Sequence, residues 1–353
     1  MNTLESIGLN DHIRNHLLRR NLSSQQIGRV LRHYKTQYLV RSDEKEAPAE
    51  LTGNLLHAGD EHPVVGDWVQ VVDFDGKYII THLLPRYSQL ARKSIHSGGR
   101  AQLIGANIDQ AFIIQSLDHD FNLNRLERYI TMAFDGGVQP IVILNKADLV
   151  SEDELNELVT SVKKRINEDI QILAISALQE QGLMDLNGLL RPGTTSCFVG
   201  SSGVGKSTIL NRFLDADHQM TADISSSTSK GRHTTTSRQL FLVQGGGIVM
   251  DTPGMRELGV ASSAKGLKTG FANISELSEQ CRFTDCTHQD EPGCAVQKAV
   301  SDGHIDVDQL DNYLKLIHES QRFQKTKAEM NREGKRFGKI LKEAQAHRKT
   351  RKP

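Results

Sequence analysis

The stretch GSSGVGKST, residues 200–208, matches the pattern GxxxxGK[ST] and lies between a strand-like apolar run and a helix-like pattern of apolar residues. Before it, TSCFVG at 195–200 has the composition of a buried strand, and after it STILNRFL at 207–214 has helical periodicity. This context predicts a phosphate-binding loop, because glycines let backbone N–H groups face phosphate oxygens where a helix begins. The residues expected to contact phosphate or its metal ion are Gly200, Ser201, Ser202, Gly203, Val204, Gly205, Lys206, Ser207 and Thr208.

Side chains of this loop and of a later motif have predicted catalytic and metal-binding roles. Lys206 is expected to reach the β- and γ-phosphates and so to take part in catalysis, and Ser207 to offer its hydroxyl to Mg²⁺. The motif DTPG at 251–254 ends another apolar strand. We expect Asp251 to hold Mg²⁺ through water and the Gly254 N–H to sense the γ-phosphate.

The segment GRHTTT, 231–236, supplies threonines, one of which should close over Mg²⁺ when a γ-phosphate is present. Spacing does not decide which threonine does so, and we assign this role to Thr235. Met255 stands where many GTPases carry a water-orienting glutamine, so intrinsic hydrolysis should be slow and a partner should activate it. His233 is the candidate to position the attacking water, and an ordinary loop histidine is the alternative.

A base-reading motif, NKAD at 145–148, follows the apolar run PIVILN. Asp148 can accept hydrogen bonds from guanine N1–H and the 2-amino group, which adenine lacks. Two such charge-assisted bonds at about 1.5–3 kcal/mol each correspond to a preference of roughly 10²- to 10⁴-fold. Asn145 is expected to tie this loop to the phosphate loop, and the stem of Lys146 to lie along the base. The expected base-binding residues are Asn145, Lys146, Ala147 and Asp148, with Ser176 and Ala177 of the string SAL as accessory contacts.

Apolar strand-length runs alternate with helical patterns from residue 106 onward, which predicts an α/β parallel sheet with its ligand at the carboxyl ends of the strands. Helices are expected at 123–135 and 152–168, the second opened by a capping box of Ser151 and Glu154. The expected strands are AFIIQS (111–116), PIVILN (140–145), QILAIS (171–176), TSCFVG (195–200) and GGIVMD (246–251).

The motifs run in the order NKAD, SAL, GSSGVGKST, GRHTTT, DTPG, so the base reader precedes the phosphate loop. A sheet tolerates such a circular permutation, because nucleotide contacts depend on where strand ends lie in space and linkers between them cost little. DTPG then leads directly into the carboxyl-terminal part of the chain. We hypothesise that a γ-phosphate-dependent movement is passed to that part.

Three cysteines and a histidine gather in CRFTDCTHQDEPGC, residues 281–294. Three thiolates and an imidazole suffice for a closed, tetrahedral structural Zn²⁺ site, one ion per chain. The alternatives are free cysteines, or a disulfide with one cysteine left over; Cys197 is expected in the core. The expected zinc ligands are Cys281, Cys286, His288 and Cys294.

The whole chain has a formal net charge of zero, but both of its ends are basic. Residues 1–35 hold 6 Lys and Arg against 2 Asp and Glu, and 321–353 hold 12 against 3. Basic ends are compatible with RNA or acidic-protein partners, and a solvated tail with no partner is the alternative. No run is long enough to cross a bilayer and the amino terminus lacks a signal-peptide pattern, so we expect a cytoplasmic protein without a membrane partner.

The amino-terminal third is expected to combine short helices with a small barrel. Residues 1–35 are read as helices with Ile13, Leu17 and Leu18 on one face. From Gln37 to Arg92, short β-rich runs separated by turns predict a barrel of the oligonucleotide-binding kind, and a β-barrel without a ligand is the alternative. Trp68 is expected in its core.

These motifs in this order resemble the circularly permuted, ribosome small-subunit-dependent GTPases, bacterial assembly factors for the 30S subunit. The resemblance covers about residues 37–320. It implies an oligonucleotide-binding (OB-like) barrel, a circularly permuted α/β P-loop GTPase domain and a helical zinc-binding domain. It also implies binding of 16S rRNA on the 30S subunit and a catalytic role for His233. The expected domains are 1–36 (helical appendage), 37–100 (barrel), 101–262 (GTPase), 263–320 (zinc-binding) and 321–353 (basic tail).

The leading functional hypothesis is therefore a monomeric enzyme that hydrolyses GTP to GDP and phosphate when the 30S subunit stimulates it, during late maturation of that subunit. One alternative is an RNA-binding placeholder whose nucleotide state matters but whose turnover does not. Another is a GTPase that acts on a different cellular target.

Overall fold

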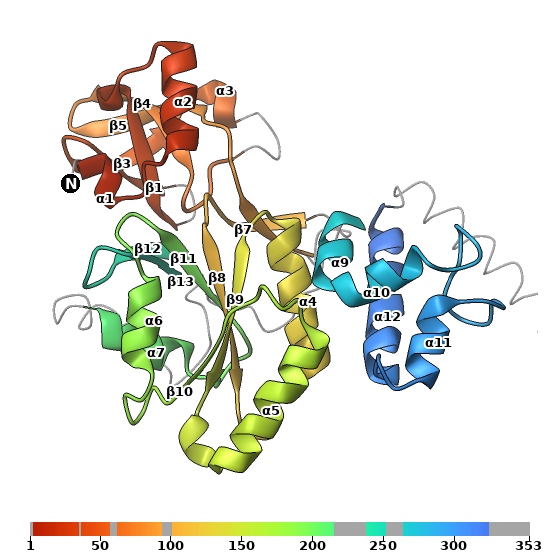
Figure 1. The fold of residues 1–353 in the computed structure, drawn as a ribbon. Coiled ribbons are helices and arrows are strands. Elements are labelled where there is room, and N and C mark those ends of the chain that lie inside the picture. Colours follow the sequence, from red (N-terminus) through yellow and green to blue (C-terminus); the bar gives the residue numbers. More distant parts are fainter. Residues whose placement is uncertain are drawn as a thin grey trace, which may run out of the picture.

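The structure is a computed structural model that describes residues 3–34, 37–56, 62–93, 101–214, 238–251 and 264–324. A barrel, an α/β sheet domain and a group of carboxyl-terminal helices follow one another along the chain (Figure 1). The expectations for His233, Thr235, Gly254 and Met255, and for most of the basic tail, lie outside the described residues. Among the helices that the structure describes, none is long and apolar enough to span a membrane.

Two short helices and a 3₁₀ turn open the chain: α1 (Thr3–Ser6), α2 (Asp11–Arg20) and η1 (Ser24–Gln26). The side chain of Asn10 caps α2 by accepting a hydrogen bond from the Ile13 N–H. Ile13 and Leu17 are buried, together with Trp68, in a small core between these helices and the barrel. Leu18 is 79% exposed, so its expected place on the apolar face is wrong. Five residues after Ile13, it has turned well away from that face.

Five strands form the predicted barrel, which closes because the first strand pairs with both the second and the fourth. The barrel has its own core, to which Val30, Val40 and Ile80 belong. Trp68 is fully buried, as predicted, but it lies in the separate core between the barrel and the amino-terminal helices. The expectation that residues 1–35 are helical is wrong for Ile27–Tyr34, which form strand β1. Backbone hydrogen bonds from three neighbouring strands decide this conformation, and local propensity is too weak to oppose them. The barrel elements are β1 (Ile27–Tyr34), β2 (Gln37–Ser42), β3 (Glu46–Leu51), β4 (Trp68–Phe74) and β5 (Lys77–Leu83), with α3 (Gly53–Leu56) after β3.

The predicted parallel sheet is present, with strand order β10-β9-β8-β11-β13. The next strand, β12, which the sequence patterns did not indicate, runs antiparallel to β13. Alternate residues of β8 face opposite cores: Ile113 packs on the side of α4 and α5, and Phe112 on the side of α6 and α7. The strands are β8 (Gln110–Ser116), β9 (Gln139–Asn145), β10 (Ile172–Ile175), β11 (Thr195–Val199), β12 (Arg238–Leu242) and β13 (Ile248–Asp251).

The helices of this domain cover both faces of the sheet (Figure 1). The capping box of Ser151 and Glu154 is present at the start of α5. That helix ends at Arg165, three residues before its expected end, because Ile166 takes an extended conformation. The helices are α4 (Leu123–Asp135), η2 (Ala147–Leu149), α5 (Glu152–Arg165), α6 (Leu183–Leu189) and α7 (Lys206–Phe213).

The barrel and the sheet domain are joined edge to edge. Strand β1 pairs with β12, so that barrel and sheet form one continuous set of hydrogen-bonded strands. Arg29 of β1 is fully buried at this junction and donates to Ile7 O, Gly66 O, Asn107 O and Thr195 Oγ1. A separate hairpin, β6 (Gln89–Lys93) and β7 (Ala101–Ala106), lies between the two parts in sequence.

Four helices complete the described chain: α9 (Ala264–Gly270), α10 (Ala272–Ser278), α11 (Ala295–Ser301) and α12 (Val307–Gln324). Helix α9 packs closely on α4, since a Cβ added at Gly270 would lie 2.6 Å from Thr131 Oγ1. Helix α12 binds α4 through polar groups: Asn312 donates to Glu127 Oε2 at 2.6 Å, and Arg128 pairs with Glu319. The carboxyl-terminal helices therefore share one core with the α4 face of the sheet.

Candidate nucleotide and metal sites

The glycine-rich loop lies between β11 and α7, at the carboxyl end of the parallel sheet. Gly205 has φ +98°, and a Cβ added there would lie 2.3 Å from Asn145 Nδ2, so conformation and space both require glycine. Lys206 donates from Nζ to the carbonyl oxygens of Gly200 and Ser201, which folds its side chain over the loop. The ammonium is thus held within the glycine-rich loop, which leads into α7, and the helix dipole at the start of α7 favours an anion.

Asn145 links three loops that the sequence assigned to one nucleotide. It ends β9, is 2% exposed, and donates from Nδ2 to Val204 O in the glycine-rich loop at 2.8 Å. Its Oδ1 accepts from the Ala177 N–H at 3.1 Å. The motifs NKAD, SAL and GSSGVGKST are therefore adjacent in space although their order in the chain is permuted.

Asp148 carries an acceptor that lacks a partner. Its Oδ1 is buried, and among the described residues it accepts no hydrogen bond. A buried unsatisfied oxygen costs about 1–3 kcal/mol, so this carboxylate is suited to a ligand that donates N–H groups. Lys146 precedes it with φ +65° and donates from Nζ to Asp118 Oδ2 at 2.8 Å. Asp118 belongs to no motif, and sequence reasoning missed it.

Neighbouring groups fix the loop after β10. The Ser176 N–H donates to Gln181 O at 3.0 Å, and Ser176 Oγ accepts from the Gln179 N–H at 3.1 Å. Arg212 of α7 donates to Ala177 O. Ser176 and Ala177 are buried, so they shape this edge of the site through backbone groups.

The two groups assigned to Mg²⁺ come from neighbouring elements. Asp251 is the last residue of β13, which pairs in parallel with β11, the strand that leads into the glycine-rich loop. Ser207 is exposed in the first turn of α7, and Thr208 is exposed beside it. A hydroxyl and a carboxylate at one edge of a sheet are the hard oxygen donors that Mg²⁺ prefers.

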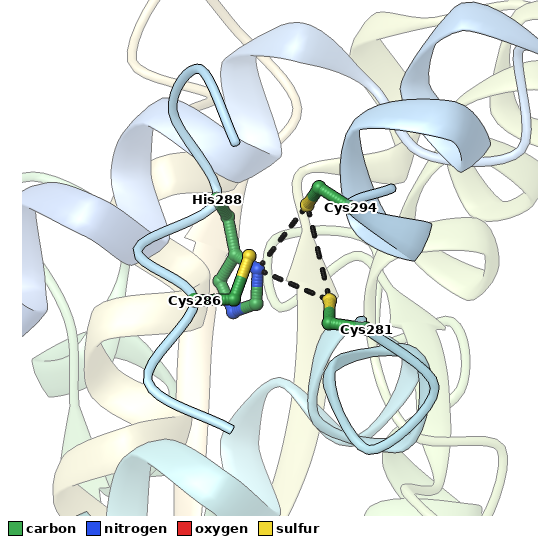
Figure 2. Close-up of side chains that lie close together, drawn as sticks. All are labelled: Cys281, Cys286, His288 and Cys294. Atoms are coloured by element: carbon green, nitrogen blue, oxygen red, sulfur yellow. Dashed lines mark hydrogen bonds between the residues drawn. The ribbon is translucent and has the colours of Figure 1, made fainter. Parts of the chain in front are cut away.

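Figure 2 shows that Cys281, Cys286, His288 and Cys294 converge on one point. Their ligand atoms all lie within 4.8 Å of one another. Cys281 Sγ lies 3.9 Å from Cys294 Sγ, and His288 Nδ1 lies 3.7 Å and 3.5 Å from these two sulfurs. Metal–sulfur bonds of about 2.3 Å in a tetrahedron imply sulfur–sulfur separations of roughly 3.8 Å, so the cluster can hold a metal ion.

The surroundings of the cluster favour metal binding. Cys294 Sγ caps α11 by accepting from the Gln297 N–H at 3.4 Å, a position that stabilises a thiolate. His288 is 6% exposed, and burial lowers the pKa of its imidazole, which keeps the ring neutral, as a metal ligand must be. All four described cysteines are free, so the disulfide alternative is not supported, and Cys197 is buried in the core as predicted.

A glycine-rich loop, the NKAD motif tied to it by Asn145 and a permuted motif order define a circularly permuted P-loop GTPase, an enzyme that hydrolyses GTP. The chain belongs to the RsgA GTPase family, whose model matches residues 83–261. A second family model, described as 50S ribosome-binding GTPase, matches residues 195–336.

Relatives are similar over almost the whole chain. The small ribosomal subunit biogenesis GTPase RsgA 2 of Vibrio parahaemolyticus is 37% identical over 350 residues, covering 99% of this chain and 95% of the relative. The small ribosomal subunit biogenesis GTPase RsgA of Methanosarcina acetivorans is 42% identical over 305 residues, covering 86% of this chain and 81% of the relative. The crystal structure of YjeQ from Thermotoga maritima matches with TM-score 0.63 and 26% identity, covering 84% of this chain and 98% of that one.

Proposed function

We propose that this GTPase binds the small, 30S ribosomal subunit through 16S rRNA and assists its late maturation, hydrolysing GTP when the subunit stimulates it. The observation that carries this is the linked nucleotide site, in which Asn145 joins three loops and Asp148 presents an acceptor that no described residue satisfies. The names of the relatives supply the ribosomal role. We propose that the protein acts in the cytoplasm, where its proposed partner is found, and as a monomer.

The site residues have distinct proposed roles. Asp148 reads guanine, Lys206 binds the β- and γ-phosphates, and Ser207 and Asp251 hold Mg²⁺. When bound, Mg²⁺ would neutralise charge that develops on the phosphates during hydrolysis. The roles proposed for Thr235, Gly254 and His233 rest on sequence alone, since these residues lie outside the described ranges.

We propose that the metal of the Cys₃His cluster is Zn²⁺, one ion per chain with a structural role. Four protein ligands fill a tetrahedron and leave no open position for catalysis. Elemental analysis of the purified protein should find one zinc per chain, and Cys286→Ser should lower this content. Another metal at the same stoichiometry, or zinc content that Cys286→Ser leaves unchanged, would contradict this assignment.

We also propose the domain limits 37–100, 101–262 and 263–320, with 321–353 as a basic tail. The fold suggests extending the barrel to include β1, because that strand closes it. The packing of α9 on α4 supports a second proposal, that the carboxyl-terminal helices are anchored on the GTPase domain and follow in sequence the DTPG motif, which begins at the end of β13. Nucleotide-dependent hydrogen exchange in α9 to α12 would test whether movement reaches them.

Steady-state GTP hydrolysis, measured alone, with 30S and with 50S subunits, tests the proposed function. We expect 30S subunits to raise turnover by a factor of about 10³ or more, within the range that a supplied catalytic group can give. Asp148→Asn should lose GTP binding and gain xanthosine triphosphate binding, because its amide can donate to the 2-carbonyl of xanthine. Stimulation by 50S subunits alone, or by neither, would refute the 30S assignment. Release from 30S that persists without hydrolysis would favour the placeholder function.

A further inference from the structure

The Lys146 side chain of the base-reading motif is held by a carboxylate outside that motif. Asp118 lies in the loop between β8 and α4, and its Oδ2 accepts from Lys146 Nζ at 2.8 Å. Both side chains are partly exposed, at 17% for Asp118 and 32% for Lys146. A charge-assisted hydrogen bond between partly buried groups is screened less than one between fully exposed side chains.

Hydrogen bonds other than that of Lys146 also hold the Asp118 carboxylate. Its Oδ1 accepts from Ser116 Oγ at 2.7 Å and from the Asp120 N–H at 2.9 Å, which leaves Oδ2 for Lys146. The Lys146 ammonium holds the pKa of Asp118 well below its usual range, so the carboxylate stays ionised at neutral pH. Contacts within the protein therefore hold Asp118 in place.

The unpaired Oδ1 of Asp148 suggests a function for the ion pair between Asp118 and Lys146. Asp148 lies two residues after Lys146, within the reach of a flexible four-carbon stem. A buried carboxylate oxygen without a partner attracts an ammonium that can reach it, yet here the Lys146 ammonium is bound to Asp118 and no described residue pairs with the oxygen. If Lys146 paired with Asp148, guanine would have to break that pair before its N1–H and 2-amino group could bind.

We propose that Asp118 is a positioning residue for guanine recognition: it holds the Lys146 ammonium away from Asp148 and so keeps the Asp148 carboxylate available for the base. This inference rests on the proposed role of Asp148 as the guanine reader. It assigns Asp118 no contact with the nucleotide.

The test uses the full-length protein and two nucleotides, GDP and inosine diphosphate, which lacks only the 2-amino group. Asp118→Asn keeps the size of the side chain and removes its charge. We expect GDP affinity to fall about tenfold, and the ratio of GDP to inosine diphosphate affinity to fall severalfold, because both contacts to Asp148 weaken. A loop that was merely distorted would lower both affinities equally and leave the ratio unchanged.

A second variant separates competition by the ammonium from other effects. Lys146→Met keeps an apolar stem and removes the charge, so in this background Asp118→Asn should change GDP affinity by less than about twofold. Asp120→Asn, in the same loop, is the matched control and should leave the GDP to inosine diphosphate ratio unchanged. The inference is overturned if Asp118→Asn leaves that ratio as in the wild type, or if it costs as much in the Lys146→Met background as with the native lysine. Absence of any guanine preference in the wild type would instead refute the proposed role of Asp148.

Discussion

At the scale of single residues, the nucleotide site depends on side chains that act between loops. Asn145 uses both ends of its amide, donating to Val204 O and accepting from the Ala177 N–H. Both partners belong to loops that are distant in sequence from NKAD. The permuted chain therefore assembles the site through a few buried polar bonds, and each of them can be tested.

The first prediction concerns Asn145→Ala. This change leaves the Val204 carbonyl and the Ala177 N–H without their partner, at a cost of about 1–3 kcal/mol for each buried group. We expect GDP affinity to fall by roughly 10- to 100-fold while the fold is retained, as measured by calorimetry and circular dichroism. The exposed Asn156 of α5 provides a control, since Asn156→Ala should leave GDP affinity unchanged. An Asn145→Ala protein with wild-type affinity would show that the link is dispensable.

The second prediction compares two glycines. Gly205→Ala introduces a Cβ that would lie 2.3 Å from Asn145 Nδ2, at a φ that disfavours alanine, so nucleotide binding should fall at least tenfold. Gly188 lies within α6 with no atom within 4 Å of an added Cβ. Gly188→Ala should therefore keep nucleotide affinity and raise the free energy of unfolding by about 0.4–1 kcal/mol. Equal effects of the two substitutions on GDP binding would contradict the structure of the loop.

At the scale of elements, α4 connects the nucleotide domain to the carboxyl-terminal helices. Glu127 of α4 is 1% exposed and pairs with Arg165 of α5, while Asn312 of α12 donates to the same carboxylate. A second pair, Arg128 with Glu319, joins α4 to α12 nearer the surface. The Asn312–Glu127 and Arg128–Glu319 contacts both join α4 to α12 and differ mainly in burial, so their contributions to stability can be compared directly.

The third prediction uses this comparison. Asn312→Ala removes a donor from a buried carboxylate and should lower the free energy of unfolding by about 1–3 kcal/mol in urea titrations. Glu319→Gln, on the same helix, should cost less than about 1 kcal/mol because its pair is partly exposed. A reversed order of these costs would mean that the buried network does not hold α12 in place.

At the scale of the whole molecule, one buried arginine joins the amino-terminal segment, the barrel and the sheet domain. Arg29 binds backbone or hydroxyl oxygens from all of them, at the end of β11 opposite the glycine-rich loop. Its role is to fix how barrel and sheet sit together, beside the pairing of β1 with β12. If the proposed ribosomal partner contacts both the barrel and the sheet domain, its effect on hydrolysis should depend on how these two parts are arranged.

The fourth prediction is that Arg29→Met separates nucleotide binding from stimulation. Several buried oxygens lose their donor, so the free energy of unfolding should fall by at least about 3 kcal/mol. GDP affinity of the folded protein should stay within about twofold, while the proposed stimulation of hydrolysis by 30S subunits should fall about tenfold or more. Arg32→Met, on the exposed face of the same strand, is the control and should change unfolding little. Equal losses of GDP affinity and stimulation would argue against a role at the junction.

The sequence by itself determined the chemistry of this protein. GSSGVGKST, NKAD and the Cys₃His spacing are local patterns, because a phosphate loop, a base reader and a metal cluster each need fixed residue types at short separations. The strands and helices of the sheet domain were also predictable, since burial imposes a period that is visible in the chain. The same reasoning misread residues 27–34 and missed β12. Each pairs with the next strand in the chain, and the two also pair with each other although they are about 200 residues apart.

Only the tertiary structure decided which residues work together. The Asn145 bonds to two other loops, the Asp118 pair with Lys146, the Arg29 junction and the contact of α12 with α4 all join residues from separate elements. No motif marks Asp118 or Arg29, because a carboxylate or a guanidinium gains its role only from the partners that folding brings within about 3 Å. Local spacing specifies the reacting groups, and the packing of the sheet specifies how they are held.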